Sequence, residues 1–196
     1  MKKKLFLGMV LMLAVMTAGP AFADTITYEG TLTLDNWATG TTTGRSWTDE
    51  IGSEVGFWSF YGNVGDTVHL VGHRLDGELD LVFSLYSGLT TADEEDFNND
   101  YDFGGLTYLN DGDDELPPYL PGPYGDPALL YCTLPTTGWY TIAIGGYESD
   151  GDGPYDYKLA MLSDPPGANG VPVPAAVWLL GSGLLGLLGL RKKSRR

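Results

Sequence analysis

The central part of this 196-residue chain carries carboxylates whose spacing suits a metal cation. Three aspartates share one Gly-containing turn, a fourth heads a predicted strand, and a fifth precedes another strand. Ca²⁺ takes about six to eight oxygen ligands and tolerates irregular loops, and closely packed carboxylates repel one another unless a cation neutralises them. We therefore predict a calcium site formed by Asp80, Asp111, Asp113, Asp114 and Asp126. A solvated acidic loop that only keeps the protein soluble is the alternative.

Other motifs of metal or catalytic chemistry fail on spacing. The acidic run 96–102 alternates like an EF-hand loop, but Tyr101 and Thr107 stand where Gly and Glu are needed. His69 and His73 are four residues apart in a run that alternates as a strand, which would set their rings about 13 Å apart. Ser182 lies in an uncharged apolar run, so it is no hydrolase nucleophile. We predict no catalytic residue.

Tyrosines in or beside loops form a second candidate site. Exposed rings flanked by acidic and amide groups commonly stack on sugars. On this basis we predict saccharide contact at Tyr101, Tyr119, Tyr124 and Tyr147. Rings that merely cover the open edges of a small sandwich are the alternative.

The charges of the chain are strongly partitioned. Eight of the eleven Lys and Arg residues lie in the two terminal segments, whereas all twenty-six Asp and Glu residues lie between them, so the body carries a formal charge of −23. Such a surface repels phosphate backbones and anionic lipid heads. Nucleic acid is therefore excluded as a partner, and cations or neutral sugars are favoured.

Both termini predict export. Residues 1–23 combine a basic start, an apolar run and a small-x-small site at Ala21 and Ala23, which is the layout of a Sec signal peptide cleaved before Asp24. At the other end, a linker over 166–174 precedes an uncharged apolar segment, 175–190, and a basic tail, 191–196. The apolar segment is just long enough for a transmembrane helix in the inner membrane, and the positive-inside rule keeps the tail cytoplasmic.

The C-terminal layout resembles a known sorting signal. The motif residues are Val171, Pro172, Val173, Pro174 and Ala175, followed by a Trp-Leu-Leu-Gly-Ser-Gly-Leu run. They are similar to the PEP-CTERM signal of Gram-negative bacteria in its VPLPA variant, although Val173 replaces the usual Leu. The resemblance implies recognition and processing by an exosortase in cells that make exopolysaccharide and biofilm matrix. A permanent C-terminal anchor is the alternative.

The body, 24–165, predicts an all-β domain. Short runs with alternating polarity are bounded by Gly, Asp, Asn or Pro, which indicates an antiparallel β-sandwich of the jelly-roll type. The expected strands cover 26–28, 31–34, 55–61, 67–71, 79–86, 128–134, 139–144 and 155–162. The Thr/Gly-rich segment 38–46 is expected to be a loop, and 87–127 a polar excursion outside the core. Cys132 is expected to be buried on one face with Leu130 and Leu134.

Several of these runs resemble a pre-peptidase C-terminal (PPC-like) domain. They are Phe57–Phe60, Val64–Val68, Glu78–Tyr86, Asn110–Asp114 and Leu134–Ile142. The resemblance implies a small β-sandwich appended to secreted proteins, often non-catalytic and able to hold calcium. The insert 116–124 departs from that pattern.

These observations predict a secreted, non-enzymatic protein of the cell surface or exopolysaccharide matrix. Its partners would be the Sec machinery, an exosortase, the inner membrane as a transient anchor, and exopolysaccharide. A secreted hydrolase that acts on matrix polysaccharide is the enzymatic alternative, because an acidic chain could supply paired carboxylates.

Overall fold

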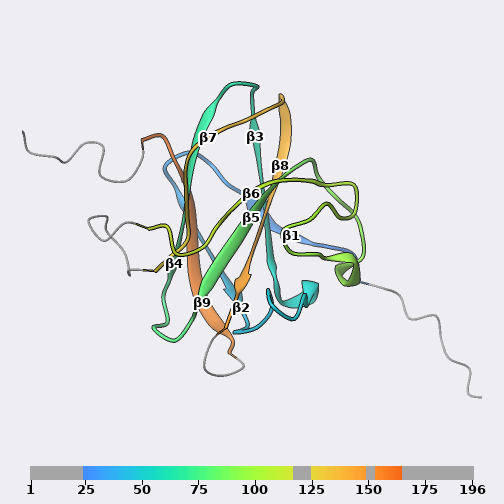
Figure 1. The fold of residues 1–196 in the computed structure, drawn as a ribbon, viewed down its shortest axis with the longest axis vertical. Coiled ribbons are helices and arrows are strands. Elements are labelled where there is room, and N and C mark those ends of the chain that lie inside the picture. Colours follow the sequence, from blue (N-terminus) through green and yellow to red (C-terminus); the bar gives the residue numbers. More distant parts are fainter. Residues whose placement is uncertain (1–23, 117–124, 149–152, 165–196) are drawn as a thin grey trace, which may run out of the picture.

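The computed structural model describes residues 24–116, 125–148 and 153–164 (Figure 1). The predicted signal peptide, the Pro-containing sorting motif, the apolar segment 175–190 and the basic tail lie outside these ranges. The strands are β1 (Tyr28–Thr31), β2 (Trp37–Thr42), β3 (Gly56–Gly62), β4 (Thr67–Arg74), β5 (Leu81–Ser87), β6 (Thr107–Gly112), β7 (Ala128–Thr133), β8 (Gly138–Gly146) and β9 (Tyr155–Leu162). Two short 3-10 helices, η1 (Gly52–Glu54) and η2 (Glu94–Asp96), lie in the connections.

The predicted β-sandwich is confirmed. One sheet has the order β1-β3-β8-β5-β6 and the other β2-β9-β4-β7. From β2 to β9, each strand lies in the other sheet from the strand before it, except that β5 and β6 lie in the same sheet. All strand pairs other than β1–β3 are antiparallel. This is the arrangement of a jelly roll. The prediction of a purely antiparallel sandwich was wrong at one edge, because β1 runs parallel to β3.

The core between the sheets follows from strand alternation. Inward-facing side chains of β3, β5 and β8, such as Phe60, Phe83 and Ile142, meet those of β4 and β9, such as Leu70 and Leu159. All five of these side chains are inaccessible to solvent. Because one face of each strand must be buried, this packing fixes the register of every strand and therefore which side chains point outward.

Two strands lie where no strand was predicted. The segment 38–46 was expected to be a loop, but its first half belongs to β2, which pairs with β9 from Trp37 opposite Ala160 to Thr42 opposite Tyr155. The second is β6, inside the supposed excursion 87–127. Both strands are rich in Thr, Gly, Asn or Asp, so their propensity is weak and pairing with a strong neighbour determines them.

The excursion also contributes a second core, contrary to the expectation that it stays outside. Phe97, Phe103 and Leu106 are buried against Phe57 and Trp47 on the outer face of the five-stranded sheet. The rings pack edge to face, with centroids 5.4 Å apart for Trp47 and Phe97. The segment 88–106 is therefore a cover for this sheet.

A bulge in β7 changes the environment of the only cysteine. Tyr131 has φ 59°, and the β4–β7 register shifts between Val68 and Leu70. The alternation that would place Leu130, Cys132 and Leu134 on one face is therefore broken: Leu130 packs on the outer face and Leu134 in the core. Cys132 is only half-buried, and burial raises the pKa of its thiol.

Within residues 24–116, 125–148 and 153–164, no helix has the length and apolarity needed to cross a membrane.

Candidate functional site

Three of the five predicted metal ligands come together at one end of the sandwich. Asp80 directly precedes β5, and Asp113 and Asp114 directly follow β6. Since β5 and β6 are antiparallel neighbours, with Phe83 opposite Gly112, the start of one strand and the end of the other lie side by side. One carboxylate oxygen from each aspartate lies within 4.8 Å of the other two. We call this trio the acidic site.

The electrostatics of the acidic site favour a bound cation. The pKa of Asp113 is raised to about 6, first by burial and then by the negative charges of Asp114, Asp80, Glu115 and Asp111, in that order. The pKa of Asp80 is also raised, first by burial and then by Asp114. Burial and mutual repulsion both disfavour the ionised carboxylates, and a divalent cation would offset both effects.

The geometry suits Ca²⁺. Its bonds to oxygen are about 2.3–2.6 Å long, so two ligands on opposite sides of the ion are separated by roughly 5 Å. The observed limit of 4.8 Å therefore allows all three carboxylates to contact one ion. The remaining ligands would come from second carboxylate oxygens, backbone carbonyls or water.

Asp111 takes other partners. It lies inside β6, opposite Ser84. The hydroxyl of Tyr108 donates a hydrogen bond of 2.6 Å to its carboxylate. Asp111 nevertheless contributes negative charge that raises the pKa of Asp113.

Asp126 is fully buried and belongs to a separate ion-pair network. Its Oδ1 accepts a 2.6 Å hydrogen bond from Nε of Arg74, and its Oδ2 lies 2.9 Å from Nδ1 of His73. The Arg74 guanidinium also donates to the carbonyl of Gly125 at 2.6 Å. Asp126 thus holds the chain before β7 to the end of β4.

The histidines have separate environments on the outer face of the four-stranded sheet. His73 stacks on Trp37 with centroids 4.9 Å apart, and the Lys158 ammonium lies 4.6 Å from the centre of the Trp37 ring. His69 accepts a hydrogen bond from the backbone N–H of Tyr131, and burial lowers its pKa. Val71 lies between His69 and His73 on the same face of β4, and within the described ranges the two histidines are not part of one candidate metal site.

The predicted saccharide contacts do not form one cluster among the described residues. The side chains of Tyr101 and Tyr147 are 66% and 44% exposed, without a ring contact between them. Tyr119 and Tyr124 lie outside the described ranges. Sequence reasoning missed another exposed pair: Tyr61 and Trp139 lie opposite each other on β3 and β8 and pack edge to face, 5.7 Å apart. Alternation along these two strands could have identified the pair.

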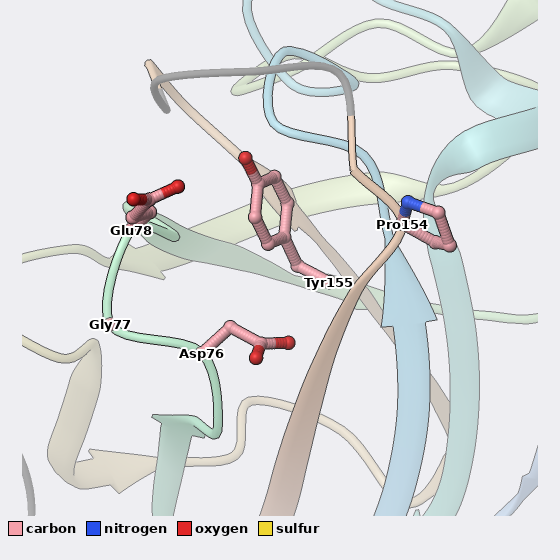
Figure 2. A pocket seen from close by; sticks show the side chains of 5 residues that line it. All are labelled: Asp76, Gly77, Glu78, Pro154 and Tyr155. Carbon is pink, nitrogen blue, oxygen red and sulfur yellow. The ribbon is translucent and has the colours of Figure 1, made fainter.

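A shallow depression of about 350 Å³ lies near the acidic site, lined by Asp76, Gly77, Glu78, Pro154 and Tyr155 (Figure 2). The carboxylates of Asp76 and Glu78 do not face each other across it. Asp76 accepts a 2.9 Å hydrogen bond from the backbone N–H of Asp156. This bond links the loop 75–80 to β9, which is a structural role and not the poised acid–base pair of a hydrolase.

Comparison with known proteins supports the fold. No family model and no curated protein matches the sequence. Among solved structures, CorA, a surface-associated copper-binding protein of Methylomicrobium album BG8, is 16% identical; the match covers 68% of this chain and 97% of CorA, with a TM-score of 0.51. At this identity the likeness shows a shared fold.

Two further solved structures match with lower scores. The secreted copper-binding protein MopE of Methylococcus capsulatus is 11% identical, over 74% of this chain and 90% of MopE, with a TM-score of 0.47. A pre-peptidase C-terminal domain of a Bacillus anthracis collagenase is 12% identical, over 69% of this chain and 97% of that domain, with a TM-score of 0.39. Membership of the PPC-like class stays a prediction.

Proposed function

We propose that this protein is an exported, non-enzymatic β-sandwich module of the cell surface or exopolysaccharide matrix, stabilised by Ca²⁺ at the acidic site. The observation that carries the proposal is the convergence of Asp80, Asp113 and Asp114, whose oxygens are spaced for one ion. The terminal segments of the sequence support export and exosortase sorting.

Calcium is preferred to copper because of the donor set. CorA binds copper, but the acidic site offers only carboxylate oxygens. Copper favours imidazole and sulfur ligands, whereas Ca²⁺ takes hard oxygen ligands. Cu²⁺ is therefore the informative competitor in any binding experiment on this protein.

Calcium is expected to raise the melting temperature of the purified protein by about 5–10 °C at a concentration near 100 times its Kd. The change Asp113→Asn should remove most of this shift, because it deletes one charged ligand at nearly constant volume. Asp96→Asn, at an exposed aspartate in η2, is the matched control and should keep the full shift. Differential scanning calorimetry with calcium and with chelator measures both. An equal shift for both variants would contradict the proposal.

The calcium-induced shift in melting temperature is also expected to depend on pH. The folded state raises the pKa of Asp113 to about 6, above its usual value near 4. Without calcium, the contribution of this group to stability is therefore highest below pH 4, decreases as pH rises to about 6, and is constant above that. Calcium must displace the proton, so the calcium-induced shift should be larger at pH 7.5 than at pH 5. A shift that does not depend on pH would exclude Asp113 as a ligand.

Intact-mass spectrometry tests the sorting part of the proposal. Protein recovered from the medium of an exosortase-competent cell is expected to begin at Asp24 and to lack the basic tail 191–196. In a matched strain without the exosortase, the tail should remain and the protein should stay with the membrane fraction. A full-length tail on protein released by the competent strain would favour a permanent anchor.

A further inference from the structure

We propose that the end of the sandwich opposite the acidic site binds a neutral oligosaccharide on Tyr61 and Trp139. This inference rests on the proposed function and deepens it, because it names the class of ligand and the surface at which the protein would bind matrix polysaccharide. The turn 63–66 and the turn 134–137 form this end, at the top of Figure 1. We call it the aromatic end.

The strand pairing builds an aromatic platform at this end. Tyr61 and Trp139 are cross-strand partners near the end of β3 and the start of β8, and both side chains point to the outer face of the five-stranded sheet. Their exposed fractions are 55% and 43%. The rings meet at 81°, so the edge of one ring contacts one face of the other, and each ring keeps at least one face that its partner does not cover. Open aromatic faces of this kind pack against the C–H face of a sugar ring.

A groove continues from Tyr61 between the two sheets. Its volume is about 580 Å³, which lies within the usual range for small-ligand sites. The floor is apolar, formed by Leu32, Phe60, Val68 and Met161. The rim carries hydroxyl groups, including those of Thr31, Thr33, Thr67 and Ser163. An apolar floor with a hydroxyl-bearing rim complements a sugar, whose ring has apolar faces and a polar periphery.

Hydrogen-bonding groups beside the platform are free to bind a ligand. Within the described ranges, no residue takes the indole N–H of Trp139, the hydroxyl of Tyr61 or the hydroxyl of Thr67 as a hydrogen-bond partner. All three side chains are exposed. Each ring therefore offers both a face for stacking and a polar group for one sugar hydroxyl.

The charge distribution selects a neutral ligand. The body has three cationic side chains, and each is engaged elsewhere: Arg45 pairs with Asp49, Arg74 with Asp126, and Lys158 lies over Trp37. Asp66 is the charged residue that lines the groove. With a formal body charge of −23, the aromatic end would repel a uronate-containing or phosphate-containing polymer.

Titration calorimetry with a β-1,4-linked glucose hexamer tests this site on the full chain. We expect binding, with a loss of at least tenfold in affinity for Trp139→Ala and for Tyr61→Ala, whereas Trp139→Phe and Tyr61→Phe should retain most of it. Tyr101→Ala removes a ring that is 66% exposed and lies in the segment 88–106, and it should change the affinity less than twofold. A galacturonate hexamer should bind at least tenfold more weakly at low salt, because of its charge.

Three outcomes would overturn the inference. One is the absence of binding to the neutral hexamer. Another is equal loss for Tyr101→Ala and Trp139→Ala. The third is a chain that is dimeric in sedimentation and becomes monomeric on Trp139→Ala, which would assign the aromatic end to self-association.

Calcium-induced stabilisation of Trp139→Ala separates the two proposals. If this variant is still stabilised by calcium while the wild type does not bind the sugar, only the inference about the aromatic end is wrong. If Asp113→Asn binds sugar but wild type shows no calcium shift, only the calcium proposal falls.

Discussion

Replacing Asp126 with alanine is expected to lower the free energy of unfolding by about 3–5 kcal/mol, because it leaves the Arg74 guanidinium of a buried ion pair without its counter-charge and His73 without its hydrogen-bond partner. The carboxylate is fully buried, and both of its oxygens are used, by Arg74 and by His73. Arg74 is itself mostly buried, so water cannot replace the lost carboxylate at full strength. The change would also release residues 125–127 from β4.

Urea denaturation with and without chelator distinguishes this structural role from calcium binding. If Asp126 acts through the ion pair, the loss should be the same in both conditions; a calcium ligand would show its loss only when calcium is present. The double variant with Arg74→Ala should be less destabilised than the sum of the two single variants. Asp49→Ala breaks an exposed Asp–Arg pair and is the matched control, with almost no effect expected. An Asp126→Ala variant as stable as this control would refute the network.

The acidic site was largely predictable from sequence, whereas its separation from Asp126 was not. Asp80 and the turn 113–114 converge because β5 and β6 are neighbours. The sequence indicated a strand after Asp80 and an acidic turn at 111–114, but not the strand β6 that brings them together. The partner of Asp126 depends on where β7 begins relative to β4, which is set by core packing. One signal was available: Arg74 is one of three cationic side chains in a body with twenty-six acidic residues, which favours an ion pair at this position.

The fold was predictable where alternation is strong and not where it is weak. β9 alternates large apolar residues with others, and β3 and β8 are rich in aromatic or branched apolar residues, so these runs identified the three strands. The Thr-Gly sequence of β2 and the Asn-Asp-Gly end of β6 have turn composition, and their structure depends on pairing with β9 and β5. The bulge at Tyr131 likewise follows from fitting β7 onto β4, so the side of Cys132 could not be deduced from spacing.

Replacing Trp47 with alanine is expected to destabilise the protein by about 3–5 kcal/mol, because a large cavity would remain in the second core. The indole is 2% exposed and packs edge to face on Phe97. The backbone of Trp47 bonds to Gly146 at the end of β8, and its carbonyl accepts from Asn99 in the cover. The backbone of Trp47 thus links the loop 43–51 to the sheet and to the segment 88–106, and the packing of the indole on Phe97 is the part that Trp47→Ala removes.

Trp139→Ala is the matched control, since it removes the same side chain from an exposed cross-strand pair. Its loss should be about 1 kcal/mol or less. Hydrogen exchange locates the effect: in Trp47→Ala the amide of Ile26, which bonds to the carbonyl of Ala92, should lose protection before the amides of β8. If both variants were equally stable, the segment 88–106 would not be anchored by Trp47. Uniform loss of protection would instead mean that the cover and the sandwich unfold as one unit.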